Sequence, residues 1–228
     1  MVLLGRIDSA KSHCKQAGVL VSLARRFDSY VRKKELVRGM THTNSRDSKT
    51  VFIIYGRNTQ ASTEVEKFLL AVGLRPLTFQ EARRKAGTQP SVFEIVKFGV
   101  STAQAVIALF TPDEWSALDP TFIYPHDRDS ERARWQARPN VPFEAGLAMG
   151  LNQGGTILVT LGAVELPSDI SGLHQFRLSN EPSHRHEFRR LLKQLGCPVD
   201  EDGTHFLDAA KAGDFSAPKA RATRDPFG

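Results

Sequence analysis

The sequence of 228 residues predicts an α/β domain built on a parallel sheet. Two observations support this fold class. Short, continuous apolar runs recur along the chain, and such runs are typical of strands that are buried on both faces of a sheet. Between them lie stretches with apolar residues three and four positions apart, the spacing of amphipathic helices. Because strands that alternate with helices pair in parallel through right-handed crossovers, we expect a flavodoxin-like, five-stranded sheet of order 2-1-3-4-5 flanked by helices.

The expected elements follow in order. The apolar runs predict strands at 51–55, 74–79, 105–110, 156–161 and 174–178. Amphipathic patterns predict helices at 59–72, 91–101, 140–151 and 183–196, the first ending before Gly73. The polar segments 80–90 and 111–139 are expected to be loops. The second is long, and long loops in compact domains are often functional. Its two tryptophans, Trp115 and Trp135, could stack on a base, or they could simply pack at the surface.

The chain divides into four parts by composition. Residues 1–40 have an intermittent apolar stripe and predict a helical N-terminal extension, and the polar, turn-rich residues 41–50 predict a linker. The α/β domain is expected at 51–205, followed by a C-terminal tail at 206–228. Residues 1–48 hold ten Lys/Arg and four Asp/Glu, which accounts for the whole net charge of +6. A basic stripe within the domain would be expected of a nucleic-acid-binding protein, so this distribution argues against nucleic acid as the partner.

The composition and the spacing of the cysteines and histidines also indicate the compartment in which the protein is expected. No run of about 18 apolar residues is present, so we expect no membrane span, and the N-terminal apolar stretch is too short for a secretory signal. The two cysteines, Cys14 and Cys197, lie far apart and indicate free thiols in a reducing compartment. The histidines and cysteines show no metal-ligand spacing, so no metal is expected. We therefore expect a cytoplasmic protein.

Polar residues follow the first and third expected strands. In a sheet of this order, ligands bind beyond the carboxyl ends of the strands where the strand order reverses. This rule selects Gly56, Arg57 and Asn58 after the first strand, and Thr111 and Asp113 after the third. Gly56 permits close backbone approach, Arg57 can pair with a phosphate, and Asn58 can cap the next helix or contact the ligand. The alternative for both segments is an ordinary turn.

The stretch 138–150, RPNVPFEAGLAMG, carries a single carboxylate, Glu144, on an otherwise apolar helix. An ionised group is costly in apolar surroundings unless it has a partner. The small residues Ala145, Gly146, Ala148 and Gly150 would let the helix lie close to the sheet and bring Glu144 to the strand ends, which makes Glu144 a candidate functional residue. Arg138 and the expected N-cap Asn140 flank the start of the helix and are candidate ligand contacts. The alternative is a structural glutamate that offsets the helix dipole or pairs with Arg57, Arg134 or Arg138.

The motifs VFIIYGRN, VGLRPLTF, AVIALFTPDE, RPNVPFEAGLAMG and LPSDISGLHQFRL occur in the order seen in bacterial TIR-like predicted nucleotide-binding proteins, and the chain resembles this family over about 50–205. The resemblance implies a Toll/interleukin-1 receptor (TIR) fold. Relatives in bacterial defence cleave NAD at the nicotinamide–ribose bond, and some form cyclic ADP-ribose. Glu144 matches their catalytic glutamate, and Gly56-Arg57-Asn58 matches their glycine-basic turn.

The resemblance also implies self-association, because the loop after the second strand, here 81–90, often completes the site of a neighbouring subunit. The expected function is therefore an NAD+ hydrolase of bacterial defence, with NAD as its substrate. Expected partners are further copies of the chain, joined through TIR–TIR contacts or the N-terminal helices, and an activating protein or second messenger. The sequence departs from the family at Tyr55 (usually histidine) and Pro142 (usually aliphatic). Asn140 occupies the position one turn before the glutamate, where an aromatic residue stacks on nicotinamide in the relatives that have one; some TIR-like proteins lack it. A nucleoside deoxyribosyltransferase-like enzyme and a non-catalytic nucleotide-binding scaffold remain as alternatives.

Overall fold

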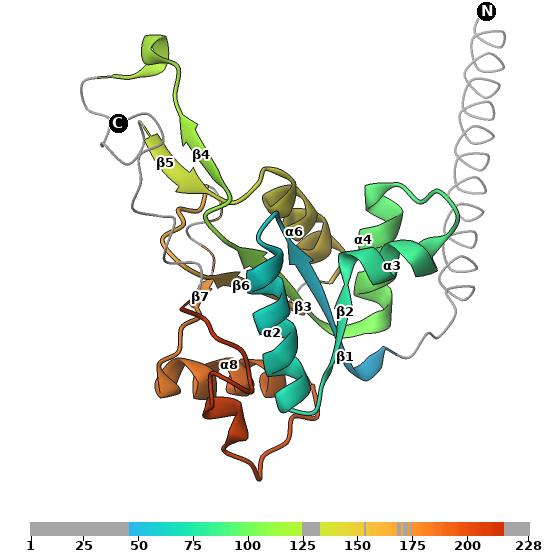
Figure 1. Ribbon diagram of the computed structural model, residues 1–228. Helices are drawn as coiled ribbons and strands as arrows, with labels where there is room; N and C mark the ends of the chain where they lie inside the picture. The colour runs from blue at the N-terminus through green and yellow to red at the C-terminus, as the bar shows by residue number, and fades with distance from the viewer. Residues whose placement is uncertain are drawn as a thin grey trace, which may run out of the picture. The chain divides into compact units, whose positions relative to one another are not determined.

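The computed structural model describes residues 46–124, 133–152, 154–167, 170, 173 and 175–216. The expected helical extension 1–40 and the end of the tail, 217–228, lie outside this part of the chain. Within it, the sheet contains β1 (Asp47–Tyr55), β2 (Arg75–Thr78), β3 (Ala103–Phe110), β6 (Thr156–Thr160) and β7 (Gln175–Arg177). Their order is β2-β1-β3-β6-β7 and every pairing is parallel. The predicted fold class and strand order are confirmed (Figure 1).

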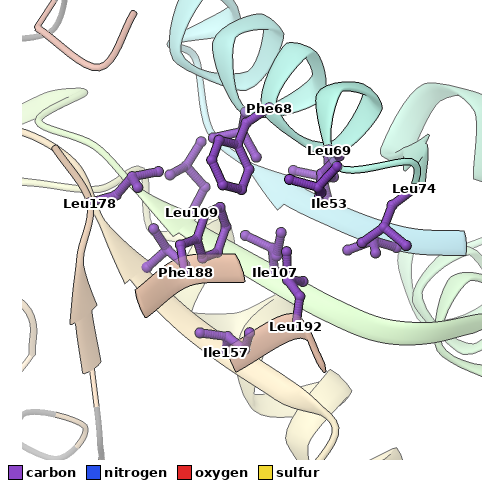
Figure 2. Packing of buried hydrophobic residues seen from close by; sticks show 14 of the residues in the cluster. Ile53, Phe68, Leu69, Leu74, Ile107, Leu109, Ile157, Leu178, Phe188 and Leu192 are labelled. Atoms are coloured by element: carbon purple, nitrogen blue, oxygen red, sulfur yellow. The ribbon is translucent and has the colours of Figure 1, made fainter. Parts of the chain in front are cut away.

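Helices cover both faces of the sheet. The apolar residues of α2 (Thr59–Ala71) and α8 (Pro182–Gln194) pack on one face, and those of α3 (Phe79–Ala86), α4 (Val92–Thr102) and α6 (Asn140–Leu151) pack on the other. Alternate residues of the central strands supply the two cores, because successive side chains of a strand point to opposite faces. Figure 2 shows the first core, which includes Phe68 of α2, Phe188 of α8 and Leu109 of β3. The rings of Phe68 and Phe188 stack with their centroids 5.1 Å apart.

The segment expected to be a polar loop at 80–90 begins instead with helix α3. The helix starts with a capping box: the Glu81 N–H donates to Thr78 Oγ1 at 3.2 Å, and the Thr78 N–H donates to Glu81 Oε2 at 3.0 Å. These reciprocal bonds satisfy two backbone donors that a helix start otherwise leaves free. The Thr-x-x-Glu pattern was therefore a readable helix signal within a segment that looked too polar for a helix.

The segment expected to be a single loop at 111–139 contains an antiparallel hairpin. Its strands are β4 (Glu114–Ala117) and β5 (Ala133–Gln136), and a short 3-10 helix at Pro120–Phe122 follows β4. Trp115 and Trp135 lie directly opposite each other, and their rings meet edge to face with centroids 5.4 Å apart. Such cross-strand aromatic pairs stabilise sheets. A polar composition concealed these short strands. In Figure 1 the hairpin projects beyond the sheet from the end of β3.

Both ends of the folded region lie outside the expected limits 51–205. Strand β1 begins at Asp47, within the expected linker 41–50. At the other end, residues expected to form a tail pack into the α2–α8 core through Phe206, Ala212 and Phe215. Arg185 of α8 is fully buried and holds this segment, since its guanidinium donates to the carbonyl oxygens of Phe206 at 2.8 Å, Ala212 at 3.2 Å and Gly213. Residues 206–216 are therefore part of the domain.

Candidate functional site

The carboxyl ends of β1 and β3 are tied together by Asp113. Its Oδ2 accepts a hydrogen bond from the Arg57 backbone N–H at 3.0 Å, and its Oδ1 accepts one from the Thr111 hydroxyl at 2.7 Å. Gly56 is required for this approach, because a Cβ at Gly56 would overlap Asp113 Oδ2. The two segments that the switch-point rule selected are thus adjacent, joined by a clamp around Asp113.

The residues of these segments have different freedom to contact a ligand. Thr111 is buried and its hydroxyl donates to Asp113, so Thr111 is a positioning residue that holds the Asp113 carboxylate in place. Asn58 caps α2, with Oδ1 accepting from the Ala61 N–H at 3.0 Å. The Arg57 side chain is exposed and forms no ion pair or hydrogen bond with another described residue. Of these residues, Arg57 is the one whose side chain is free to bind an anion.

Glu144 lies on the face of α6 that packs against the sheet. It is only 6% exposed, and its neighbours on that face, Val141, Ala145 and Ala148, are buried. The small residues that permit this packing are the two alanines. Gly146 and Gly150 are exposed and a Cβ on either would meet no atom within 4 Å, so the expectation that they bring the helix close to the sheet is wrong.

The carboxyl group of Glu144 is in an unusual electrostatic environment. Burial raises its pKa from 4.5 to about 7, and the positive charge of nearby Arg138 opposes part of this rise. Within the described part of the chain, no hydrogen bond or ion pair reaches the carboxylate, although a structural ion pair with Arg57, Arg134 or Arg138 was a plausible alternative. Arg134 instead lies 4.0 Å from Glu165. A buried carboxyl with a strongly raised pKa and no described partner is a candidate functional residue.

Arg138 and Asn140 approach the site from the start of α6. The Arg138 Cβ lies 3.4 Å from the position that a Cβ on Gly56 would take, so Arg138 is close to the end of β1, and its charge also acts on the Glu144 carboxyl. Asn140 is exposed and is the first helical residue; the N-cap is Pro139, with no side-chain capping bond. The expected N-cap role of Asn140 is therefore wrong, because proline already sets the start of the helix. The structure thus gathers Gly56, Arg57, Asp113, Arg138 and Glu144.

Tyr55, a departure from the family pattern, belongs to the other face of the sheet. It packs against the α2–α8 core, where burial and the negative charge of Glu66 raise its pKa. Side chains of consecutive strand residues alternate between faces, so Tyr55 points away from the face that carries Glu144. The substitution therefore leaves the immediate surroundings of Glu144 unchanged.

A cavity of about 600 Å³ lies elsewhere along the same edge of the sheet, beneath the hairpin, and its lining does not include Glu144. Most of the residues that line this cavity were not predicted from the sequence, because the cavity is formed by the hairpin and by the register of the strands. In the described ranges, no group of three or more His, Cys, Asp or Glu could hold a metal ion. None of the helices in these ranges is long and apolar enough to cross a membrane.

A five-stranded parallel sheet of this order, with helices on both faces, defines a flavodoxin-like α/β domain, the fold class to which TIR domains belong. Comparison with known proteins narrows the class to one family. Residues 50–180 match the TIR domain of the CAP12/Pycsar effector protein family, and the chain belongs to this family of bacterial defence effectors.

A curated relative extends the comparison. The chain is 31% identical to the uncharacterized protein YuaY of Escherichia coli (strain K12) over 157 residues, which make up 68% of this chain and 48% of YuaY. The aligned region thus spans about half the length of that relative.

Proposed function

We propose that this protein is an NAD+ hydrolase that cleaves the nicotinamide–ribose N-glycosidic bond and releases ADP-ribose or its cyclic form. The observation that carries the proposal is the single buried carboxyl of Glu144, placed on the helix that follows the Asp113 clamp and partnered by no described residue. Membership of a TIR effector family supports it.

The chemistry explains why one carboxylate can suffice. When the bond between the ribose C1′ and the nicotinamide nitrogen breaks, both bonding electrons go to the positively charged nitrogen, and nicotinamide leaves as a neutral molecule. No general acid is therefore needed. The ribose becomes oxocarbenium-like, as in glycoside hydrolysis. Ionised Glu144 would stabilise this positive charge, and in a buried site such stabilisation is strong. Water then adds to C1′ and releases one proton; for the cyclic product, a nucleophilic atom of the ADP-ribose moiety itself adds to C1′ in place of water.

Arg57 and Arg138 would have different roles in the reaction. Arg57, exposed at the end of β1, would hold the pyrophosphate through charged hydrogen bonds. Arg138 lowers the pKa of Glu144 and so keeps more of this carboxyl ionised near neutral pH. Asp113 and Gly56 would position the Arg57 backbone rather than contact substrate.

Self-association would regulate the reaction. We propose that TIR–TIR contacts or the N-terminal residues assemble the chain in response to a partner or second messenger, and that the segment 81–90, most of which lies in helix α3, completes the site of a neighbour. Turnover per molecule should then rise with protein concentration. A turnover rate that stays proportional to protein concentration over the whole range, with a constant monomeric mass in light scattering, would contradict regulation by self-association. This result would leave the proposed NAD cleavage unaffected.

The direct test is NAD turnover with product identification for wild type and Glu144→Gln. Loss of the charge should lower turnover by about 100-fold or more, the scale of removing one electrostatic stabiliser. Glu66→Gln is the matched control, because Glu66 is also a partly buried carboxyl of raised pKa but lies on α2, on the opposite face. Equal turnover by wild type and Glu144→Gln, or no nicotinamide release by concentrated wild type, would overturn the proposal. A covalent glycosyl adduct on Glu144 would indicate a deoxyribosyltransferase-like enzyme instead.

The pH profile provides an independent readout. Because the ionised form of Glu144 is the active one, kcat/KM should rise with pH through about 7. Arg138→Gln removes the charge that holds this pKa down, so the rising limb should move to higher pH. Arg190→Gln, an exposed arginine on α8, should leave the limb in place. An unchanged limb in Arg138→Gln would exclude this role for Arg138.

A further inference from the structure

The hairpin forms one wall of the 600 Å³ cavity. Glu165, beyond the end of β6, donates its backbone N–H to the Trp135 carbonyl oxygen at 3.0 Å, which fastens the hairpin to the segment that follows β6. The cavity is lined by this Trp115–Trp135 pair, by Arg134, by residues 162–165, and by Thr160, Gln175 and Arg177. Its volume falls in the range of small-molecule sites.

Strand register places the polar groups on one face. Phe176 of β7 is buried on the α2–α8 side, so Gln175 and Arg177 point to the other face, toward the hairpin. Thr160 of β6 pairs with Arg177 in the sheet and shares that face. The Thr160 hydroxyl, the Gln175 amide and the Arg177 guanidinium therefore line the same cavity as the two indole rings.

The charges of the cavity favour an anion. Arg134 and Arg177 line it together with one carboxylate, Glu165, which lies 4.0 Å from Arg134. Arg177 forms no ion pair or hydrogen bond with another residue in the described ranges, so no described group competes with a ligand for its guanidinium. A guanidinium with five donors suits a phosphate, and an aromatic surface suits a nucleobase, because every base offers a face for stacking.

We propose that this cavity is a second binding site for a 5′-phosphorylated nucleoside, separate from the Glu144 site, in which the base stacks on Trp115 or Trp135 and Arg177 binds the phosphate. The lining of the cavity comes from β6, β7, the segment 162–165 and the hairpin, and it includes neither Glu144 nor the residues of the Asp113 clamp. The site goes beyond NAD cleavage and does not depend on it.

The chain carries its own reporter for this site, because Trp115 and Trp135 are its only tryptophans and both line the cavity. Adenosine 5′-monophosphate titrated into the full-length protein should produce a saturable change in tryptophan emission, with N-acetyltryptophanamide as the correction for absorption by the nucleotide. Adenosine and ribose 5-phosphate each carry half of the recognised chemistry, so each should bind more weakly than the complete nucleotide.

Arg177→Gln should weaken adenosine monophosphate binding about tenfold or more, the effect of losing one charged hydrogen bond. Arg75→Gln is the matched control, since Arg75 is an exposed strand arginine on β2, at the opposite edge of the sheet. Arg177 is exposed, so both variants should fold, and circular dichroism verifies this. No saturable change, equal affinity in Arg177→Gln, or ribose 5-phosphate binding as tightly as the nucleotide would each overturn the proposal. The same titration on Glu144→Gln, which should match wild type, separates this result from that for NAD cleavage.

Discussion

Replacing Glu144 by glutamine should make the protein more stable, and increasingly so as the pH rises. In the folded protein the pKa of Glu144 is raised from 4.5 to about 7, mainly by burial, so the fold prefers the protonated carboxyl. The wild type therefore has its full stability below about pH 4.5 and loses some of it as the pH rises through about 7. At about 1.4 kcal/mol for each tenfold difference in proton affinity, ionised Glu144 costs the fold about 3 kcal/mol.

Glutamine has the same shape and does not ionise, so the variant escapes this cost. The difference in unfolding free energy between Glu144→Gln and wild type should grow by about 3 kcal/mol between about pH 4.5 and about pH 8. In thermal unfolding this corresponds to roughly 6 to 12 °C in Tm for a domain of this size. Urea unfolding at the two pH values, followed by circular dichroism, measures the free energies directly.

Glu94→Gln provides a control of opposite sign. Hydrogen bonds from Ser91 lower the pKa of Glu94, so its ionised form is the one the fold prefers. That variant should gain nothing over wild type at about pH 8. A stability difference for Glu144→Gln that stays constant with pH, or that favours wild type more at high pH, would refute the reasoning about Glu144.

Three further predictions concern the framework of the domain. Gly56→Ala should displace Asp113, lowering the free energy of unfolding by about 1–3 kcal/mol and reducing NAD cleavage; unfolding by urea that matches wild type would contradict the clamp. Arg185→Leu leaves buried carbonyl oxygens without donors and should cost about 3–5 kcal/mol, with proteolysis beginning in residues 206–216; a fully protease-resistant variant would count against it. Burial raises the pKa of the Cys197 thiol to about 11, so in a Cys14→Ser background this cysteine should react with a disulfide reagent only on unfolding; rapid labelling of the native protein would show it to be accessible.

The sequence predicted the sheet and its strand order because those properties depend on local apolar periodicity and on connection rules. The same rules placed Gly56, Arg57 and Asp113 near each other, and the structure joins them through one carboxylate. Glu144 could be singled out as a lone charge among apolar residues. Its pKa and the absence of a partner among the described residues could not be predicted, since both depend on how α6 packs on the sheet.

Where prediction failed, the deciding interactions were non-local or were masked by polar composition. The hairpin depends on pairing between residues about twenty positions apart, and its strands are only four residues long. The arginine of α8 that holds residues 206–216 looks like any other charged residue of an amphipathic helix. Helix α3, by contrast, has a capping box at Thr78 and Glu81 that is visible in the sequence, although the composition of the helix is polar.

The part of this chain that matches the family model is shorter than the part that folds. The family match stops at residue 180, yet α8 begins at Pro182 and the segment held by Arg185 reaches residue 215. A fragment cut at the family boundary would keep α2 but would expose to water the apolar surface that α8 and residues 206–215 cover, and it would be expected to aggregate. A version of this domain that is expressed alone, or fused to another protein, must therefore include α8 and the segment up to residue 215. Any natural gene fusion that moved the domain intact would have had to do the same.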